Sequence, residues 1–368
     1  MLVSLLSDNL LEKISFLNHA VSSRATLPIL SNFLLETKRG KLVISATDLE
    51  IGISAEVPAS VEKEGKTTVL AKNFLDLITN IKDQKIKLEL EENVLKLKGD
   101  KVRASFQTMS ADEFPKLYEQ KGDVILTLEK KDVEKFFQRV SFAAAVDSSR
   151  PSLLGVLFEK GKEGVVLVAT DQYRLSYQKT PLKLKEGLEK PIVVPGRVIK
   201  ELSFLKEDDG KISFCVSKEN NQVVITQAET EIVGRLIDAD YPQYEKIMPE
   251  DADTKTEIDR EELLNAIRIC SVFARETANI VKLSVEKDKL VVSANSPQVG
   301  EDLVEIAAKT IGEGNEIAFN AKYLIDVLTT LEEEELIFEM TGPLNPGVFK
   351  VKGDNNFLHL IMPIRIQG

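Results

Sequence analysis

Three clusters of carboxylates are the residues of this 368-residue chain whose type and spacing could bind a metal ion. They are Asp238 with Asp240, Glu250 with Asp251 and Asp253, and the run from Glu332 to Glu335. Carboxylate oxygens are the ligands that Mg²⁺ and Ca²⁺ prefer. All three clusters fall at predicted turns or element ends, where acidic side chains are usually solvated. The sequence therefore predicts no metal site and no cofactor, with a carboxylate-dependent metal nuclease as a rival hypothesis.

The other residues that commonly do chemistry are few and scattered. His19 and His359 lie in a predicted helix and a predicted C-terminal strand, without neighbours typical of catalysis or metal binding. The chain has no Gly-rich phosphate loop, His-Glu-x-x-His motif or Gly-x-Ser-x-Gly turn. Cys215 and Cys270 are too few and too far apart for a disulfide framework or a zinc site. We therefore predict a protein with no catalytic residues and with both cysteines used in packing.

The overall composition is that of a soluble globular protein. Hydrophobic residues make up 43% of the chain, and no stretch approaches 18 consecutive apolar residues. The N-terminus lacks the basic start and the cleavage site of a secretory signal, so we expect a cytoplasmic protein with no membrane partner. The formal net charge of −11 argues at first against a nucleic-acid partner, because phosphate binding usually accompanies an excess of basic residues.

Positive charge is nevertheless concentrated in the predicted helices. Six stretches are expected to be helical: 8–24, 72–82, 129–150, 195–206, 259–275 and 320–331. Together they hold 16 Lys and Arg against 12 Asp and Glu, so the rest of the chain carries −15. Helices that share one surface would offer phosphates a weakly basic path that ignores base sequence. Aromatic residues do not interleave with these charges, which favours duplex over single-stranded DNA.

Two of these helices show the spacing of a buried apolar stripe. One stripe consists of Val133, Phe136, Phe137 and Val140, and the other of Leu263, Ile267, Cys270 and Ala274. Around the first stripe, Lys131 and Lys135 lie on the opposite side and Arg139 lies at the flank. For one such helix alone, an ordinary solvated helix face is the better explanation. Six helices with the same bias make a shared basic surface the better interpretation.

The elements that must position these residues recur along the chain. Residues 46–53 read ATDLEIGI and residues 169–176 read ATDQYRLS, 123 positions apart. The preceding strands LPILSNFLLE and RPSLLGVLFE match as well, and TANIVKLSVE keeps the alternation more weakly. The later segments TTVLAKNFLDLI, PIVVPGRVIKELSFL and NEIAFNAKYLIDVLTTL repeat at a similar interval. Self-similarity at a fixed period predicts repeated structural units; a tandem duplication whose copies took separate roles is the alternative.

Each third of the chain is expected to contain two helices and two runs of alternating antiparallel strands, an α+β fold. Polar, charged residues without apolar periodicity mark junctions near 118–125 and 249–256. We therefore predict three domains, at residues 1–120, 121–252 and 253–368.

The repeated motifs together identify a family. LPILSNFLLE, ATDLEIGI, VLAKNFLDLI, SADEFPKL, VATDQYRLS, DADYPQYEKIMP, FNAKYLIDVL and a closing MPIRI resemble the bacterial DNA sliding clamp, the beta subunit of DNA polymerase III holoenzyme. The resemblance runs from about residue 1 to 366, in order. It implies three domains of the DNA-clamp fold, a head-to-tail homodimeric ring with helices lining the hole, and a processivity factor, not an enzyme.

The resemblance also implies three sets of site residues. The ring interface would contain Lys101, Arg103, Phe106, Val272, Phe273, Glu301, Asp302 and Glu305. Duplex DNA would be contacted by Arg24, Lys72, Arg150 and Arg197. A pocket for short peptides of the polymerase, the clamp loader and repair proteins would contain Leu153, Thr170, Tyr173, Arg174, Leu175, Pro242, Ile247, Leu360, Ile361, Met362, Pro363, Ile364 and Arg365. Without the resemblance, core packing and solvated charge explain many of these residues.

The chain departs from the family pattern at two places in the pocket. Gln172 and Tyr173 stand where the family often has Gly-His, which puts the width and the peptide preference of the pocket in doubt. Lys246 replaces a frequent Arg and would lose a bidentate carboxylate contact. A scaffold that gathers peptides without encircling DNA is the main rival function.

Overall fold

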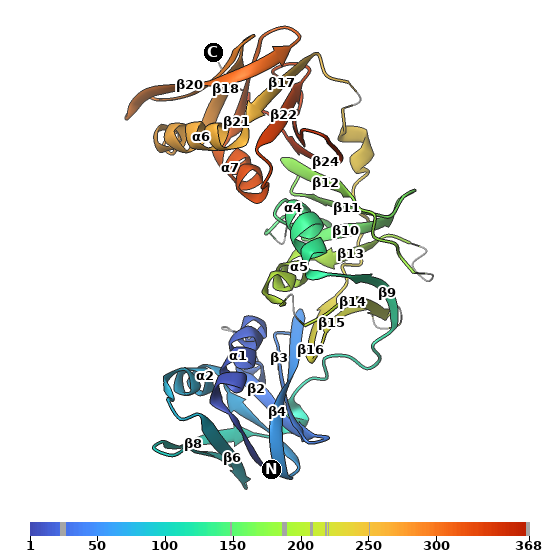
Figure 1. Ribbon diagram of the computed structural model, residues 1–368, viewed down its shortest axis with the longest axis vertical. Coiled ribbons are helices and arrows are strands. Elements are labelled where there is room, and N and C mark those ends of the chain that lie inside the picture. Colours follow the sequence, from blue (N-terminus) through green and yellow to red (C-terminus); the bar gives the residue numbers. More distant parts are fainter. Residues whose placement is uncertain are drawn as a thin grey trace. The chain divides into compact units, whose positions relative to one another are not determined.

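A computed structural model describes residues 1–22, 27–147, 149–185, 190–206, 209–217, 219, 221–249 and 251–365. Its contacts divide the chain into two compact units. Unit 1 contains residues 1–130 and most of 200–236, and unit 2 contains most of the remaining chain. Each unit is built around one twelve-stranded antiparallel sheet with helices packed on it (Figure 1).

The sheet of unit 1 has the order β1-β6-β7-β8-β5-β2-β3-β4-β16-β15-β14-β9, and β1 also pairs with β4. Its strands are β1 (Leu2–Leu6), β2 (Asn32–Lys38), β3 (Lys41–Thr47), β4 (Ile51–Lys63), β5 (Gly65–Leu70), β6 (Lys85–Glu91), β7 (Val94–Lys98), β8 (Arg103–Met109), β9 (Asp123–Leu128), β14 (Ile212–Ser217), β15 (Gln222–Gln227) and β16 (Thr230–Arg235). Helices α1 (Ser7–Leu17) and α2 (Ala71–Asn80) contact each other and pack on its strands.

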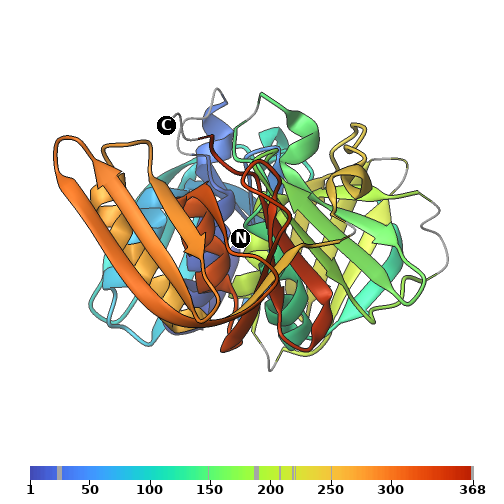
Figure 2. The same ribbon diagram turned by 90° about the horizontal axis from the view of Figure 1, so that it is seen from above.

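The sheet of unit 2 has the order β13-β10-β11-β12-β24-β23-β22-β17-β20-β19-β18-β21. Its strands are β10 (Gly155–Lys160), β11 (Val165–Thr170), β12 (Arg174–Lys179), β13 (Ile192–Pro195), β17 (Thr254–Asp259), β18 (Ile280–Val285), β19 (Lys289–Ser296), β20 (Gly300–Ile311), β21 (Asn315–Asn320), β22 (Glu335–Met340), β23 (Gly347–Val351) and β24 (Asp354–Ile361). Helices α6 (Arg260–Ala274) and α7 (Ala321–Thr330) lie together against one face of β18–β21 (Figure 2).

The apolar stripes predicted for the helices are confirmed. In α6, Leu263, Ile267, Cys270 and Ala274 are completely buried. Asp259 is the N-cap residue that precedes the helix, and its side chain accepts a hydrogen bond from the backbone N–H of Glu262. An acidic N-cap of this kind satisfies one of the free N–H groups of the first turn. Its sequence therefore fixes both where α6 begins and which face it buries.

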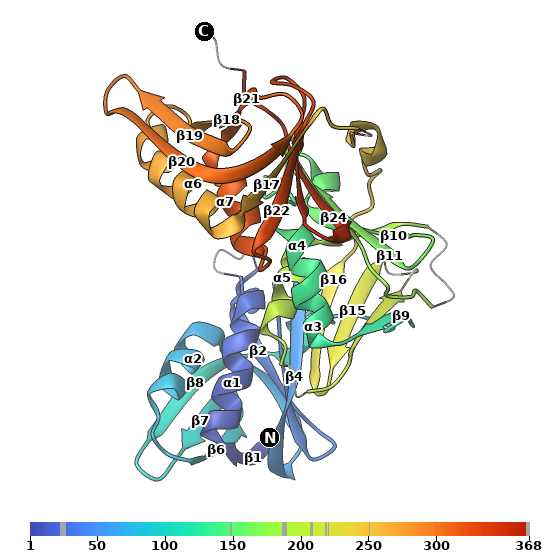
Figure 3. The ribbon, with the colours of Figure 1, turned by 45° about the horizontal axis from the view of Figure 1, so that its top comes forward.

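The helical segment of the middle third is shorter than expected and changes its winding. It consists of α3 (Lys130–Asp132), a π-helical turn over Val133–Phe137 and α4 (Gln138–Ser141). Helix α5 (Gly196–Glu201) is the other helix of this third (Figure 3). The Val133, Phe136, Phe137 and Val140 stripe is buried as predicted.

The repeat is visible in the strand register. Leu34 pairs with Ser45 between β2 and β3, and 123 positions later Leu157 pairs with Val168 between β10 and β11. The middle third is shared between the sheets, because β9 and β14–β16 join the first and β10–β13 join the second. The contacts thus divide the chain into two units, and the domain boundaries at 120 and 252 stay a prediction.

Candidate functional site

The turn between β11 and β12 is built by the repeated Ala-Thr-Asp motif. The hydroxyl of Thr170 donates to the carbonyl of Arg174 at 2.6 Å and accepts from the N–H of Gln172 at 3.1 Å. Oδ1 of Asp171 accepts from the N–H groups of Tyr173 and Arg174, both at 3.0 Å. Two adjacent side chains thereby satisfy the backbone of a tight turn.

The first copy of the motif makes the same turn between β3 and β4. The hydroxyl of Thr47 donates to the carbonyl of Ile51 and accepts from the N–H of Leu49, and Asp48 accepts from the N–H groups of Glu50 and Ile51. In both copies the residue after the aspartate has a positive φ, 77° at Leu49 and 81° at Gln172. The motif recurs because Thr and Asp close this left-handed turn.

Arg174 leaves this turn at the start of β12 and ties several elements together. Its guanidinium donates to Asp171 at 3.0 Å, to Asp326 at 2.6 Å and to the carbonyl of Phe142 at 3.1 Å. The guanidinium carbon lies 4.7 Å from the centre of the Tyr323 ring. Only 7% of Arg174 is exposed. Its role in the candidate site is therefore to hold neighbouring side chains in place.

Two tyrosines form the accessible edge of the site. The rings of Tyr173 and Tyr323 are stacked, with centres 6.4 Å apart and planes 16° apart. Tyr173 is 60% exposed. The C-terminal segment lies beside it, because the N–H of Met362 donates to the carbonyl of Tyr173 at 2.8 Å and that of Ile364 to the carbonyl of Ala318 at 2.8 Å. An apolar shelf is thus fixed by backbone hydrogen bonds.

The pocket residues named from the sequence divide by exposure. Buried are Leu153, Thr170, Arg174, Leu175, Leu360 and Ile361. Pro363 and Ile364 are half-buried, and the exposed members are Tyr173, Pro242, Ile247, Met362 and Arg365. The structure brings Tyr173, Arg174 and the C-terminal segment together through the contacts above. The buried members form the floor, and only the exposed ones can meet a ligand.

Three residues of this cluster were missed by the sequence analysis: Phe142, Tyr323 and Asp326. All three contact Arg174. One signal for Tyr323 was available, since it lies beside the Leu324, Val327 and Leu328 stripe of α7, where a large aromatic side chain is left partly exposed. Asp326 and Phe142 gave no such signal, because their contacts with Arg174 join segments more than 30 residues apart.

A buried histidine lies beneath the shelf. The hydroxyl of Ser176 is 2.6 Å from Nδ1 of His359, and the His359 ring centre is 5.1 Å from that of Phe142. Burial, together with the nearby charge of Arg174, lowers the pKa of His359 well below its usual 6.5. His359 is therefore a neutral core residue in the folded chain.

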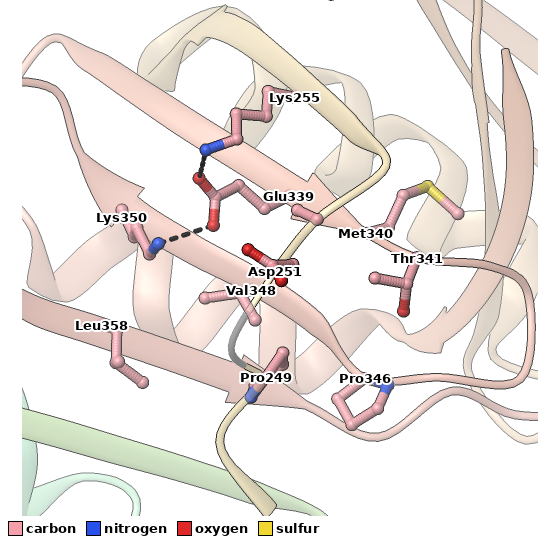
Figure 4. A pocket seen from close by; sticks show the side chains of 11 residues that line it. Pro249, Asp251, Lys255, Glu339, Met340, Thr341, Pro346, Val348, Lys350 and Leu358 are labelled. Carbon is pink, nitrogen blue, oxygen red and sulfur yellow. Dashed lines mark hydrogen bonds and ion pairs between the residues drawn. The ribbon is translucent and has the colours of Figure 1, made fainter. Parts of the chain in front are cut away.

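A small pocket of about 150 Å³ lies on the sheet of unit 2 (Figure 4). In it Glu339 is clamped between Lys255 at 3.1 Å and Lys350 at 2.6 Å. Burial alone raises the pKa of Glu339, but the hydrogen bonds from the two lysines outweigh burial and lower it overall. Both carboxylate oxygens are occupied, so this cluster is an internal ion-pair network and not an open acid.

The basic residues assigned to DNA lie on the surface where the structure describes them. Lys72 in α2, Arg150, and Arg197 in α5 are exposed. Arg24 lies outside the described residues, as does Glu250 of the acidic clusters.

Arg139 was expected to belong to the basic surface of the helices, and this expectation is wrong. Its guanidinium is buried and paired with Glu333 and Asp354, because a charge at the flank of a buried stripe needs partners. No helix among the described residues is long and apolar enough to span a membrane.

The residues assigned to the ring interface lie at two strand edges. Residues 103–107 of β8 pair only with β7, and residues 300–307 of β20 pair only with β19. Phe106 is half-buried, with its ring centre 5.6 Å from that of Phe74. Lys101 and Arg103 are exposed near one edge, while Glu301 and Glu305 are exposed on the other. A strand edge with free N–H and C=O groups can pair with a further strand.

The third-domain side of this set is unusually apolar for a surface. Val272 and Leu303 are more than half exposed, and Phe273 is partly buried beside them on α6. Both carboxylate oxygens of Asp302 are buried, and burial together with this neighbouring carboxylate raises the pKa of the Cys270 thiol. Such a patch exposes apolar surface that a partner could cover.

Comparisons with known proteins agree along the whole chain. The N-terminal, central and C-terminal domains of the DNA polymerase III beta subunit family match residues 1–118, 127–243 and 245–365. The beta sliding clamp of Staphylococcus aureus is 29% identical over 361 residues, covering 94% of both chains. Among solved structures, the beta subunit of Thermotoga maritima is 28% identical with a TM-score of 0.91, and the sliding clamp of Bacillus subtilis is 26% identical with a TM-score of 0.93. Both comparisons cover all of each chain.

Proposed function

This chain belongs to the DNA polymerase III beta subunit family and is a noncatalytic processivity factor, a sliding clamp; we propose that it works as a head-to-tail homodimeric ring. Three repeated clamp domains suit such a ring, because repeated units supply similar arcs. A head-to-tail interface closes only when the rotation per subunit completes a full turn. Closure would hold duplex DNA by confinement.

The proposal rests on the partly unpaired edges of β8 and β20. In a head-to-tail dimer, β8 of one protomer would lie along β20 of its partner, with Phe106 facing Val272 and Phe273. Lys101 and Arg103 would oppose Glu301, Asp302 and Glu305. An apolar centre with complementary charges at its rim is the usual anatomy of a specific interface. The buried carboxylate of Asp302 would then lie close to a cation.

Confinement makes strong DNA contacts unnecessary. Lys72, Arg150, Arg197 and Arg24 would contact phosphates, whose positions are independent of base sequence. The protein as a whole has a net charge of −11, so its surface outside the basic path repels DNA. The ring could therefore slide freely and still not dissociate sideways.

The shelf beside Tyr173 is the proposed docking site for polymerase and other partner peptides. Tyr173, Tyr323 and Met362 offer apolar surface at this shelf, which suits an apolar anchor residue of an extended peptide. Replacing Met362 with Ala should weaken a polymerase C-terminal peptide about tenfold in fluorescence anisotropy. The dimer should persist in sedimentation. Unchanged peptide affinity would show that the docking site lies elsewhere.

Retention on DNA of two topologies tests enclosure directly. The protein is loaded by its clamp loader onto nicked circular DNA and passed through a gel-filtration column, before and after the circle is linearised. A ring stays on the circle and slides off the linear form. Equal retention on both would reject enclosure and favour a peptide-gathering scaffold.

A further inference from the structure

A groove of about 1170 Å³ lies in unit 1, on the side of β2, β3 and β4 that points away from the buried core. Strand residues on its floor include Leu34, Glu36, Val43, Ser45 and Ser54. The segment that follows β8 forms one wall through Phe114, Leu117 and Tyr118. Alternate strand residues such as Phe33 and Ile44 point into the core, which places the floor residues on the opposite face.

The repeat supplies a second copy of this surface in unit 2. Leu34 pairs with Ser45 and Ser45 with Ser54, and 123 positions later Leu157 pairs with Val168 and Val168 with Tyr177. The floor positions of the groove therefore have direct counterparts. In order, Leu34, Glu36, Val43, Ser45 and Ser54 correspond to Leu157, Glu159, Val166, Val168 and Tyr177.

In unit 2 a tyrosine covers this surface. Tyr244, from the 3-10 helix Tyr244–Ile247, packs with Leu157, Val166 and Val168 and is only 7% exposed. Its hydroxyl donates to Glu159 at 2.8 Å. Its ring centre lies 6.0 Å from that of Tyr177. The second copy thus shows which side chain this arrangement of apolar floor and carboxylate accommodates.

In unit 1 the covering groups are smaller. The segment Phe114-Pro115 aligns with Tyr241-Pro242, so Leu117 stands at the position of Tyr244. Ser54 replaces Tyr177 and Ser45 replaces Val168. These positions therefore lack the two rings of Tyr177 and Tyr244, although Phe114 and Tyr118 line the groove. Leu34 is only half-buried, whereas its counterpart Leu157 is buried.

The carboxylate is kept although the tyrosine is absent. Glu36 occupies the position of Glu159, is half-buried, and accepts no side-chain hydrogen bond among the described residues. Two ion pairs lie at the rim, Lys41 with Glu56 at 2.5 Å and Lys66 with Asp112 at 2.5 Å, and the charge of Glu36 also acts on Lys66 from the neighbouring strand. Glu36 is thus a half-buried acceptor in the groove, near Val43 and near Leu34, which packs on one side against the cluster of Phe114.

We propose that this groove is a second docking site, which binds a tyrosine-bearing segment of a partner protein. The ring covers Leu34 and Val43, and the phenol donates to Glu36, as Tyr244 does to Glu159 in unit 2. Apolar contact provides affinity, and the hydrogen bond selects tyrosine over phenylalanine. This site is separate from the proposed shelf at Tyr173 and belongs to the other unit of the chain.

A peptide copied from the chain itself is the probe. Fluorescein-labelled ADYPQYEKIM, the sequence of residues 239–248, is titrated with the full-length protein in anisotropy, and methyl NMR follows Leu34 and Val43. We expect saturable binding that shifts both methyl signals. A peptide with phenylalanine at its second tyrosine should bind about fivefold more weakly, because one hydrogen bond is removed. No saturation at millimolar peptide would overturn the proposal.

Variants of the protein locate the binding. Ser54→Tyr restores the residue beside which Tyr244 packs in unit 2, with ring centres 6.0 Å apart, and should raise affinity about threefold by adding this ring contact. Glu36→Ala, which leaves the strands intact, should lower affinity about fivefold and abolish the preference for the tyrosine peptide over the phenylalanine peptide. A preference that survives Glu36→Ala would overturn the proposal even if Ser54→Tyr fails to fold.

Two controls exclude other occupants and other sites. Met362→Ala alters the proposed shelf in unit 2 and should leave binding of this probe unchanged. Loss of binding in Met362→Ala, with affinity unchanged in Ser54→Tyr, would move the peptide to the shelf and refute the groove. Shifts of Leu34 and Val43 that grow with protein concentration, without peptide, would assign the groove to a second copy of the chain and also refute it.

Discussion

At the scale of single residues, Gln172 and His359 both lower the stability of the folded chain near the shelf. Gln172 adopts a φ of 81°, a conformation that disfavours side chains with a Cβ. His359 is completely buried, and its Nε2 has no hydrogen-bond partner among the described residues. Both lie next to Tyr173 or Arg174. Leu49 has a similar φ of 77° in the first copy, so the cost at Gln172 belongs to the repeated turn.

Replacing Gln172 with Gly should stabilise the protein. Glycine removes the left-handed strain, worth about 1–2 kcal/mol, but gains freedom in the unfolded chain, so the net gain should be roughly 0.5–1 kcal/mol. Urea unfolding of both proteins measures the difference. The exposed Gln243, which has a negative φ, serves as the control, since Gln243→Gly should destabilise. A loss of stability in Gln172→Gly would show that its side chain makes a contact worth more than the strain.

The buried His359 should make stability fall in mild acid. The folded state holds it neutral, whereas the unfolded chain protonates it near pH 6.5. Its contribution is thus complete above about pH 6.5 and is lost as the pH falls towards the lowered folded pKa, by up to about 1.4 kcal/mol per pH unit. Urea unfolding at pH 7.5 and 5.5 should show a smaller loss for His359→Leu than for the parent. Equal losses would mean that His359 does not contribute.

At the scale of elements, the proposed ring interface depends more on strand edges than on helices. Within the described part of the chain, β8 and β20 each leave part of one edge without a partner strand, and both carry apolar and charged residues there. Helix α6 adds Val272 and Phe273 beside β20. These elements are long enough to pair, so the interface would be an extension of the sheets.

Truncating Phe106 should weaken the dimer. Its half-buried ring would become fully buried at the joint, so Phe106→Ala should cost about 2–4 kcal/mol of association free energy if it is a hot spot. Sedimentation velocity at several concentrations should then reveal monomers. Phe204→Ala removes another half-exposed phenylalanine, outside the proposed interface, and should leave the dimer intact. An unchanged dimer in Phe106→Ala would reject this interface.

At the scale of the whole molecule, the proposal separates two roles: basic residues would contact DNA, and closure of the ring would retain it. The predicted helices carry a small positive excess in an acidic protein, so in the proposed ring they would tolerate phosphates without binding them tightly. Retention would come from closure of the ring. Affinity for DNA and residence on DNA should therefore respond differently to mutation.

Removing basic residues should lower the affinity for linear DNA without shortening the residence on circular DNA. Lys72→Ala with Arg197→Ala should weaken binding to linear duplex and reduce the slope of log K against log salt by about one for each phosphate that the protein no longer neutralises. Loaded on nicked circular DNA, the same variant should still be retained. Fast dissociation from the circle at moderate salt would show that phosphate binding, and not enclosure, holds the protein.

Much of the candidate site could be predicted from motifs, because local hydrogen bonds produce them. Thr170 and Asp171 close their turn with partners within four residues, so Ala-Thr-Asp marks it wherever it occurs. The contacts of Arg174 with Asp326 and of Arg139 with Glu333 join residues more than 150 positions apart. No local pattern encodes such pairs, and Arg139 was therefore misplaced on the solvent side.

The sequence by itself determined the repeat, the apolar stripes of the helices and the family, because periodicity and local turn chemistry are written in neighbouring residues. Tertiary structure alone decided which pocket residues are floor and which are accessible, and that Tyr323 joins Tyr173. It also left one copy of a repeated surface covered by Tyr244 and the other open. Burial depends on what packs from distant parts of the chain, so identical strand patterns can end with different surfaces.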